Sequence, residues 1–404
     1  MLSVVLAVVL AGLTGCDHDE SITPPSASKD STAQHAQEAQ QTLEQLVRAV
    51  TSGSRDAAEA TAANGSQDLL GSIYDNAAAL HVGDFSLRYV DEAAPLDDSD
   101  QAELGPGAWR GTVQLTYRND GFDRAPARLE TAATFVPTGD HVRIASFGGP
   151  GERTPLWLVE PLSVVRTPRT LLAVAGTSTG RYPGLVAEAV RQVTRVLPDW
   201  KGRLQVEVPE SEDELEAALD AQPGEYDNIA AVTTTADGSL APDAPVRVFV
   251  NPQVFDRLKQ RGAQVVMSHE TTHVATDAPF ASMPTWLLEG FADFVALDHA
   301  GVPVDRAAGQ ILPRIRKEGL PDRLPTSQDL DPTANGLGAT YEEAWLACRF
   351  LAQEYGEDSM VRFYRTVNAG ASTQQAFRTV LHTTQRDFVT RWRADLARLA
   401  GVAG

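Results

Sequence analysis

The chain has 404 residues, enough for two domains with separate cores, and its 43% apolar and 22% charged residues are an ordinary globular balance. This composition excludes a wholly disordered protein. Its 54 acidic residues outnumber the 34 basic ones and give a formal charge of −20. The acidity argues against nucleic acid as the main partner, because phosphate binding needs a basic face.

The N-terminal stretch MLSVVLAVVLAGLTGC predicts a signal peptide over residues 1–15. Its apolar run is shorter than the about 20 residues of a spanning helix. The run ends in Leu-Thr-Gly-Cys, which resembles the bacterial lipobox, so Cys16 is the expected lipidation site and the mature N-terminus. No Lys or Arg precedes the run. The alternatives to a lipidated Cys16 are an uncleaved anchor and a cysteine that stands there by chance. The resemblance implies a lipid-anchored protein on the extracytoplasmic face of the cell membrane.

Residues 16–33 are rich in Ser, Thr, Pro and Asp and predict a flexible tether. Helical spacing follows in AQQTLEQLVRAV and LLGSIYDNAAAL, and then period-two runs in TVQLTYRND, ARLETAATFV and HVRIASF. We therefore expect an α+β domain over residues 34–170, in which N-terminal helices pack on a curved antiparallel sheet. The order loosely resembles the cone fold of nuclear transport factor two.

A second domain is expected over residues 171–404. It begins with the helix YPGLVAEAVRQVTRVLPDW and continues with the strands RLQVEV and NIAAVTT, the helix SEDELEAAL between them, and the strand PVRVFVN. A helix is predicted from Val254 to about Thr276, and a second one from Pro284 to Asp298. The other cysteine, Cys348, lies in the apolar-periodic stretch AWLACRFLA and is expected to be a small buried core residue.

The first of those two helices carries the motif SHETTHVAT. Positions i and i+4 of a helix share one face, so His269 and His273 can present two imidazole nitrogens to one point, which is half of a tetrahedral zinc site. Glu270 lies about 100° around the helix from His269, where a general base could reach a metal-bound water without being a ligand. Taken alone, this pattern also arises by chance.

The second helix, PTWLLEGFADFVALD, strengthens the metal interpretation. Glu289 stands there in an otherwise apolar run, and a buried carboxylate needs a partner, which a cation supplies. The combined pattern H-E-x-x-H and W-L-x-E-G-x-A resembles the gluzincin metallopeptidases of the peptidase MA-like type, over about residues 170–402. By this resemblance the second domain has a zincin-type fold with a mostly helical C-terminal part, and His269, His273 and Glu289 bind Zn²⁺.

The resemblance also makes Glu270 the residue that polarises the attacking water and Asp293 the residue that orients a liganding histidine. Independently, zinc-bound imidazoles usually donate their second N–H to a carboxylate or carbonyl. A surface aspartate is the alternative for Asp293. Related enzymes use a Tyr or His to stabilise the oxyanion, and Tyr341 occupies a comparable place, with a packing role as the alternative. Weaker candidates for the same role are Tyr364, His299 and His382.

These observations predict a zinc-dependent peptidase that acts on a peptide or protein substrate outside the cytoplasm. In gluzincins an edge strand near the metal pairs with the extended substrate, and by this resemblance either NIAAVTT or PVRVFVN could do so here. The loop from Leu324 to Thr340 is expected to be mobile, either closing over substrate or forming a passive connection. Two alternatives stay open: a zinc-retaining binding lipoprotein without hydrolytic activity, and an inhibitory pro-segment formed by residues 34–170. The sequence does not indicate the substrate or the oligomeric state.

Overall fold

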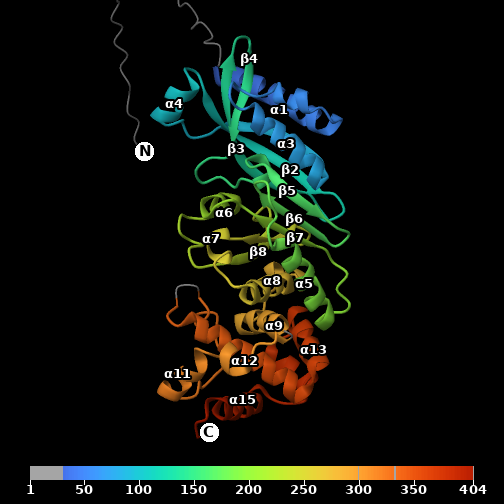
Figure 1. Ribbon diagram of the computed structural model, residues 1–404, viewed down its shortest axis with the longest axis vertical. Helices are drawn as coiled ribbons and strands as arrows, with labels where there is room; N and C mark the ends of the chain where they lie inside the picture. The colour runs from blue at the N-terminus through green and yellow to red at the C-terminus, as the bar shows by residue number, and fades with distance from the viewer. Residues whose placement is uncertain (1–30, 299, 332–333, 404) are drawn as a thin grey trace, which may run out of the picture.

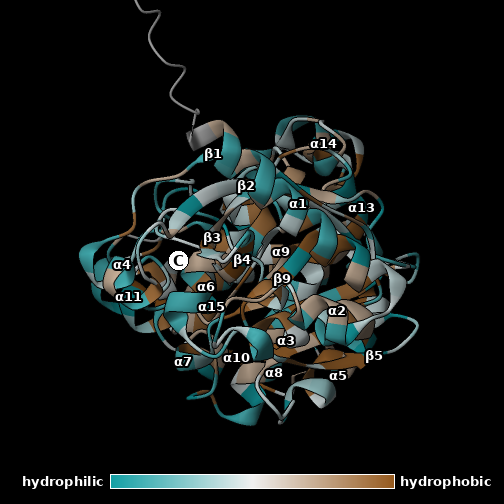
Figure 2. Cartoon of the chain, turned by 90° about the horizontal axis from the view of Figure 1, so that it is seen from above, coloured by the Kyte–Doolittle hydropathy of each residue, from teal (hydrophilic) through white to brown (hydrophobic). Residues whose placement is uncertain are grey.

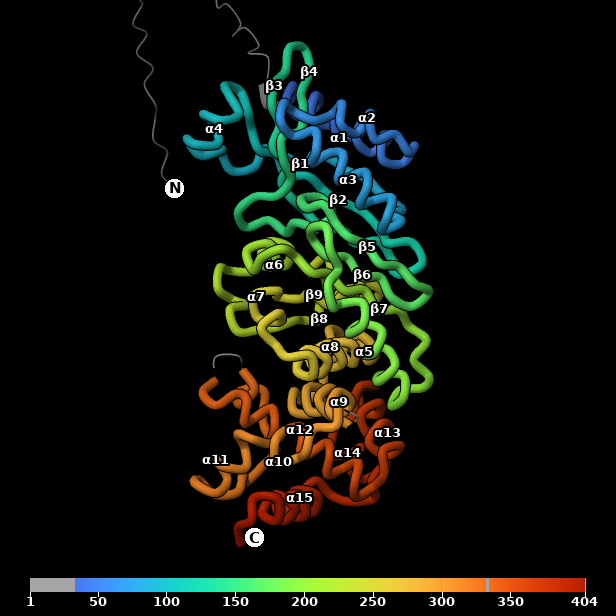
Figure 3. Tube along the Cα trace, viewed as in Figure 1, coloured from blue at the N-terminus to red at the C-terminus, as the bar shows by residue number. Residues whose placement is uncertain are grey.

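The computed structural model describes residues 31–298, 300–331 and 334–403. Within them the chain forms an α+β fold of three successive layers, which follow one another along the long axis of the molecule (Figure 1). An N-terminal layer of helices on an antiparallel sheet comes first, a mixed sheet with its helices second, and a helical C-terminal layer last. The colour sequence of the Cα trace shows that each layer is built from one continuous part of the chain (Figure 3).

The N-terminal layer is a four-stranded antiparallel sheet in the order β1-β2-β3-β4. Helices α1 and α3 pack on it, and β2 alternates between buried and partly exposed side chains, as a sheet with one covered face requires. The elements are α1 (Ser31–Ser52), α2 (Arg55–Glu59), α3 (Gln67–Leu80), β1 (Val82–Glu92), α4 (Asp98–Leu104), β2 (Trp109–Asn119), β3 (Ala127–Thr138) and β4 (His141–Phe147). The predicted order of helices followed by antiparallel strands is confirmed.

The second layer is a five-stranded mixed sheet in the order β5-β6-β7-β9-β8. Strands β6, β7 and β9 are parallel, whereas β5 and β8 pair antiparallel at the two edges. The strands are β5 (Leu162–Arg166), β6 (Thr170–Ala175), β7 (Leu204–Val208), β8 (Ala231–Thr235) and β9 (Val246–Val250), and the helices are α5 (Tyr182–Val196), α6 (Glu212–Leu219), α7 (Pro252–Phe255) and α8 (Gln260–Ala275). This sheet begins at β5, which precedes the expected domain boundary at residue 170.

The predicted helix from Val254 to Thr276 is wrong at its start. Residues Pro252–Phe255 form the short helix α7, capped by the side chain of Asn251, and the chain then becomes extended at Lys259 before α8 begins at Gln260. The apolar spacing did not reveal this break, because a one-turn helix followed by an extended residue leaves little trace in the hydrophobic pattern.

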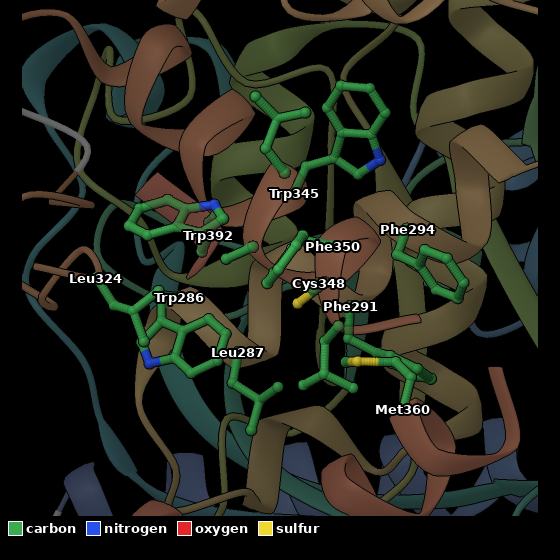
Figure 4. Packing of buried hydrophobic residues seen from close by; sticks show 14 of the residues in the cluster. Trp286, Leu287, Phe291, Phe294, Leu324, Trp345, Cys348, Phe350, Met360 and Trp392 are labelled. Carbon is green, nitrogen blue, oxygen red and sulfur yellow. The ribbon is translucent and has the colours of Figure 1, made fainter. Parts of the chain in front are cut away.

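The C-terminal layer consists of helices around one large core. These are α9 (Thr285–Asp298), α10 (Val304–Ala307), α11 (Ile311–Glu318), α12 (Leu337–Tyr355), α13 (Glu357–Asn368), α14 (Thr373–Thr379) and α15 (Gln385–Ala400); two short 3₁₀ turns, η1 (Leu156–Leu158) and η2 (Ala278–Phe280), lie earlier in the chain. Trp286, Phe291, Trp345 and Trp392 belong to this core, and Cys348 lies buried close to Phe291 (Figure 4). The prediction that Cys348 is a core residue is confirmed.

Hydrophilic residues lie mainly on the outside of the molecule, as is usual for a globular protein. Seen along the long axis, most of the outer loops are hydrophilic (Figure 2). No helix among the described residues is long and apolar enough to cross a membrane. The predicted signal peptide, Cys16 and most of the predicted tether lie outside the described residues, and α1 begins at Ser31, slightly before the expected end of that tether.

Candidate metal centre

Helices α8 and α9 pack against each other and bring three potential metal ligands together. His269 and His273 come from successive turns of α8, and Glu289 comes from the second turn of α9. One ligand atom from each residue lies within 4.8 Å of the others. The predicted trio is therefore one cluster in space.

The three ligand atoms converge on one point. The two Nε2 atoms of His269 and His273 are 3.0 Å apart, and Oε2 of Glu289 lies 3.2 Å from the first and 3.5 Å from the second. The imidazole rings stand nearly perpendicular, at 83°, so each nitrogen approaches the shared point from its own direction. Two nitrogens and one carboxylate oxygen in this arrangement fit the donor set of a zinc site with one open position.

Asp293 binds the ring nitrogen of His269 that faces away from the other ligands. Its Oδ1 lies 2.8 Å from Nδ1 of His269. A carboxylate only accepts hydrogen bonds, so Nδ1 carries the proton and Nε2 turns its lone pair to the cluster. The structure thus places Asp293 where it can orient the ring. The Nδ1 atom of His273 is buried and has no hydrogen-bond partner among the described residues.

The cluster favours positive charge. Burial alone lowers the pKa of His269, but the carboxylates of Asp293 and Glu289 outweigh it and hold the pKa well above its usual value. Burial raises the pKa of Glu289, yet His273 and His269 bring it below its usual value. In the absence of a metal the cluster therefore holds a proton tightly, and a cation offers the same compensation to its buried carboxylates.

Glu270 points from α8 toward β8 of the mixed sheet. Its carboxylate is buried and accepts a hydrogen bond from the hydroxyl of Thr233 in β8, at 2.7 Å. Burial raises the pKa of Glu270, and the nearby charges of His269 and His273 lower it in part. Glu270 is thus close enough to the cluster for the two histidines to affect its pKa, but it is not one of the three candidate ligands.

Tyr341 lies at the start of α12, half-buried beside the cluster. Burial raises its pKa, and the carboxylates of Glu289 and Asp293 raise it further, so its hydroxyl keeps its proton at neutral pH. Burial raises the pKa of Tyr364, one of the weaker candidates, and the charge of Glu289 raises it further, so this residue also lies near the trio. Tyr364 is buried with its ring stacked on Phe291, the centroids 4.3 Å apart, His382 is exposed after α14, and His299 lies outside the described residues.

The loop before α12 is partly anchored. Leu324 and Leu330 are buried in the C-terminal core, and Arg323 forms an ion pair with Asp329. Residues 332–333 lie outside the described residues. Since the apolar anchors hold the first part of the loop, the expected mobility does not extend to Leu324 and Leu330.

Two other features lie apart from the trio. A cavity of about 720 Å³ is lined by the C-terminal end of α8, Trp200, Arg124 and Tyr364, but by none of the three candidate ligands. A second group of carboxylates, Glu160, Glu210 and Glu214, is partly exposed and contains no histidine. Burial, followed by the charge of Glu214, raises the pKa of Glu160 to about 7. Neither feature offers the nitrogen donors of the main cluster.

Thr233 was not singled out from the sequence. It stands in a run of three threonines in β8, 37 positions before Glu270, and threonines are ordinary strand residues. Comparison of the sequence with protein-family models and with curated proteins finds no match.

Proposed function

We propose that the protein is a zinc-dependent peptidase of the gluzincin type. The observation that carries this proposal is the convergence of His269, His273 and Glu289 on one point, with the buried Glu270 carboxylate close beside it. A purely structural zinc site usually has four protein ligands, whereas catalytic sites have three and an open position. The trio therefore suits catalysis better than scaffolding.

The zincin-type fold of residues 171–404, and a cone-like N-terminal sheet over residues 34–170, belong to the same proposal. In support, the described chain has a mixed sheet next to the helix with the two histidines, and mostly helical structure after it.

The chain's own residues have distinct tasks in this proposal. His269, His273 and Glu289 hold the zinc ion, and Asp293 keeps the His269 ring in its orientation. Bound zinc lowers the pKa of water and polarises a peptide carbonyl. Glu270 takes the proton of the attacking water and returns it to the leaving amine. Tyr341 donates a hydrogen bond to the oxygen on which negative charge develops.

The substrate is proposed to be an extended peptide that pairs with β8. Of the two strands that the sequence left as candidates, β9 lies between β7 and β8, so both of its edges are already paired. Strand β8 is the edge strand and contacts α8. A peptide added at this edge would run beside Glu270.

Location is a separate part of the proposal. The lipobox-like Leu-Thr-Gly-Cys sequence supports lipidation of Cys16 and a place at the cell membrane, outside the cytoplasm. Labelling with a radioactive fatty acid, lost in a Cys16→Ser variant, would test this part alone.

Metal content and hydrolysis together test the proposal. We expect one zinc per purified chain, lost in His273→Ala but kept in His382→Ala, a control at an exposed histidine away from the cluster. Glu270→Gln should keep zinc and lose hydrolysis of a diverse peptide library, about 1000-fold or more for removal of a general base.

The possible outcomes are distinct. Absence of zinc in wild-type protein prepared without chelators would contradict the proposal at its base. Stoichiometric zinc without cleavage of any peptide, in wild type and in Glu270→Gln alike, would favour the alternative of a zinc-retaining binding lipoprotein.

A further inference from the structure

The hydroxyl of Thr233 is placed to hold the Glu270 carboxylate. Its oxygen lies 2.7 Å from Oε2 of Glu270 and 3.1 Å from the backbone oxygen of the same residue. One hydroxyl has one proton to donate, and the charged carboxylate at the shorter distance is the stronger acceptor. Among the described residues, no other side chain has a recorded hydrogen bond to this carboxylate. Its orientation therefore depends on Thr233.

The register of β8 shows which of its backbone groups are free. The N–H of Asn251 donates to the oxygen of Ala230 at 2.9 Å, and the N–H of Ala236 donates to that of Pro245 at 2.7 Å. These two bonds join the ends of β8 to the ends of β9, so the backbone groups of Ala230 and Ala236 point toward β9. Directly bonded pairs alternate with unbonded ones in an antiparallel ladder, and the register pairs Thr233 with Val248 between them.

Counting from Ala230 in steps of two, the bonded residues of β8 are 232 and 234. The N–H and C=O of Thr233 therefore point away from β9 to the free edge of the sheet, because β8 has no other neighbouring strand in the described part of the chain. The backbone groups of Ala231 point the same way. Those of Thr235 do too, but its C=O already accepts a hydrogen bond from the N–H of Gly238 at 3.3 Å. This edge is where an extended peptide could pair.

The side chains of β8 divide in the same alternation. Ala231 packs in the core cluster that contains Met267 of α8, whereas Val232 packs on the opposite face with Phe249. Thr233 has the parity of Ala231 and faces α8. One residue thus combines a side chain bonded to Glu270 with backbone groups directed to the open edge.

We propose that Thr233 is a positioning residue, which fixes the Glu270 carboxylate beside the backbone groups that receive the peptide. The inference rests on the proposed peptidase function and deepens it. A peptide paired at Thr233 has its backbone next to the Glu270 carboxylate, which Thr233 already holds in one orientation. Less conformational entropy is then lost when the geometry for proton transfer forms. Without the hydroxyl, the carboxylate loses its fixed direction.

Kinetics of matched variants test this role. Thr233→Val keeps the shape of the side chain and removes the hydroxyl, and it should lower kcat about 10- to 100-fold, as expected for loss of a hydrogen bond to a charged group. KM should change less than about twofold, because the backbone groups that receive the peptide are kept. Thr233→Ser should restore most of kcat. The neighbouring Thr234→Val, on the opposite face of β8, is the control and should resemble wild type.

A readout independent of hydrolysis separates this inference from the proposed function. Crystal structures of the zinc-containing variants should show the Glu270 carboxylate turned away in Thr233→Val and in its original place in Thr233→Ser. A Glu270 carboxylate that keeps its position in Thr233→Val overturns the inference, whatever the activity. If wild type cleaves no peptide, the peptidase proposal fails, while these structures still decide whether Thr233 orients Glu270.

Discussion

At the scale of single residues, the two nitrogens of His269 have different partners. Nδ1 donates to Asp293, and Nε2 faces the cluster, where it could bind a metal in place of a proton. The carboxylate fixes the tautomer and also makes the imidazole a better donor, because its negative charge stabilises positive charge on the ring. Asp293 should therefore influence metal affinity without being a ligand.

Replacing Asp293 by Asn should weaken zinc binding about 10-fold, the smaller end of the usual range, because the amide oxygen can still accept the hydrogen bond but lacks the charge. Competition against a chromogenic chelator measures the dissociation constant directly. Asp277→Asn is the matched control, because this exposed carboxylate follows the same helix and does not contact the cluster. If Asp293→Asn leaves the dissociation constant for zinc unchanged, Asp293 does not contribute to metal binding.

At the scale of helices, Gly290 allows α9 and α12 to approach closely. A Cβ atom at this position would lie 2.5 Å from the backbone oxygen of Ala344 and 2.9 Å from Sγ of Cys348. Both neighbours belong to the C-terminal core, and Figure 4 shows Cys348 within it. Because Gly290 follows Glu289 directly, the same close packing brings α12, and with it Tyr341, next to the candidate metal centre.

We expect Gly290→Ala to lower the free energy of unfolding by about 1–3 kcal/mol, since a rigid backbone oxygen cannot move aside as a side chain could. Gly184→Ala is a control within α5, where a Cβ atom would meet nothing within 4 Å. That change should be neutral or stabilising by about 1 kcal/mol, because alanine is the better helix former. Urea denaturation compares the two. Equal stability of both variants would show that α9 and α12 separate at little cost.

At the scale of the whole molecule, the mixed sheet is covered on both faces. Leu171 and Ala173 of β6 pack into the core of the N-terminal layer, whereas the alternate residues Leu172 and Val174 pack with α5 and α8. The first two layers therefore share one hydrophobic core. Residues 31–158 thus support the mixed sheet, and through it the candidate site.

A buried ionic network joins the same two layers. Arg247 of β9 donates to the hydroxyl of Tyr117 at 3.0 Å, lies 3.3 Å from a carboxylate oxygen of Asp123, and forms an ion pair with Glu207. The Arg247 and Asp123 side chains are 1% and 0% exposed. Removal of the N-terminal layer would take Asp123 and Tyr117 away from Arg247 and leave it paired with Glu207 alone.

The sequence predicted what depends on local spacing. His269 and His273 lie one helical turn apart, and the alternation of β2 is visible in TVQLTYRND, so the helix face and the strand followed from periodicity. Contacts between distant segments were not predictable in this way. The bond between Thr233 and Glu270 depends on the ladder register of an edge strand, and the bond between Arg247 and Tyr117 joins residues 130 positions apart through the packing of two sheets.

This packing bears on the idea that residues 34–170 are an inhibitory pro-segment. A fragment that starts at residue 171 would expose the Leu171 and Ala173 side of the sheet, lose β5 from its edge and leave Arg247 and Glu207 without Asp123 and Tyr117. Exposure of this apolar face to water removes stability from the fragment, because burial of apolar surface is the main favourable contribution to folding.

We therefore expect the fragment 171–404 to aggregate or to unfold at a much lower temperature than the chain 31–404, and to hydrolyse peptides more slowly. Thermal unfolding followed by circular dichroism, together with peptide hydrolysis at equal zinc content, makes the comparison. A fragment that keeps the unfolding temperature of the longer chain and cleaves peptides many times faster would favour the pro-segment, because steric blocking would then be the main effect of the N-terminal layer. Slower cleavage together with lost stability would identify that layer as structural support for the sheet whose edge strand contacts Glu270.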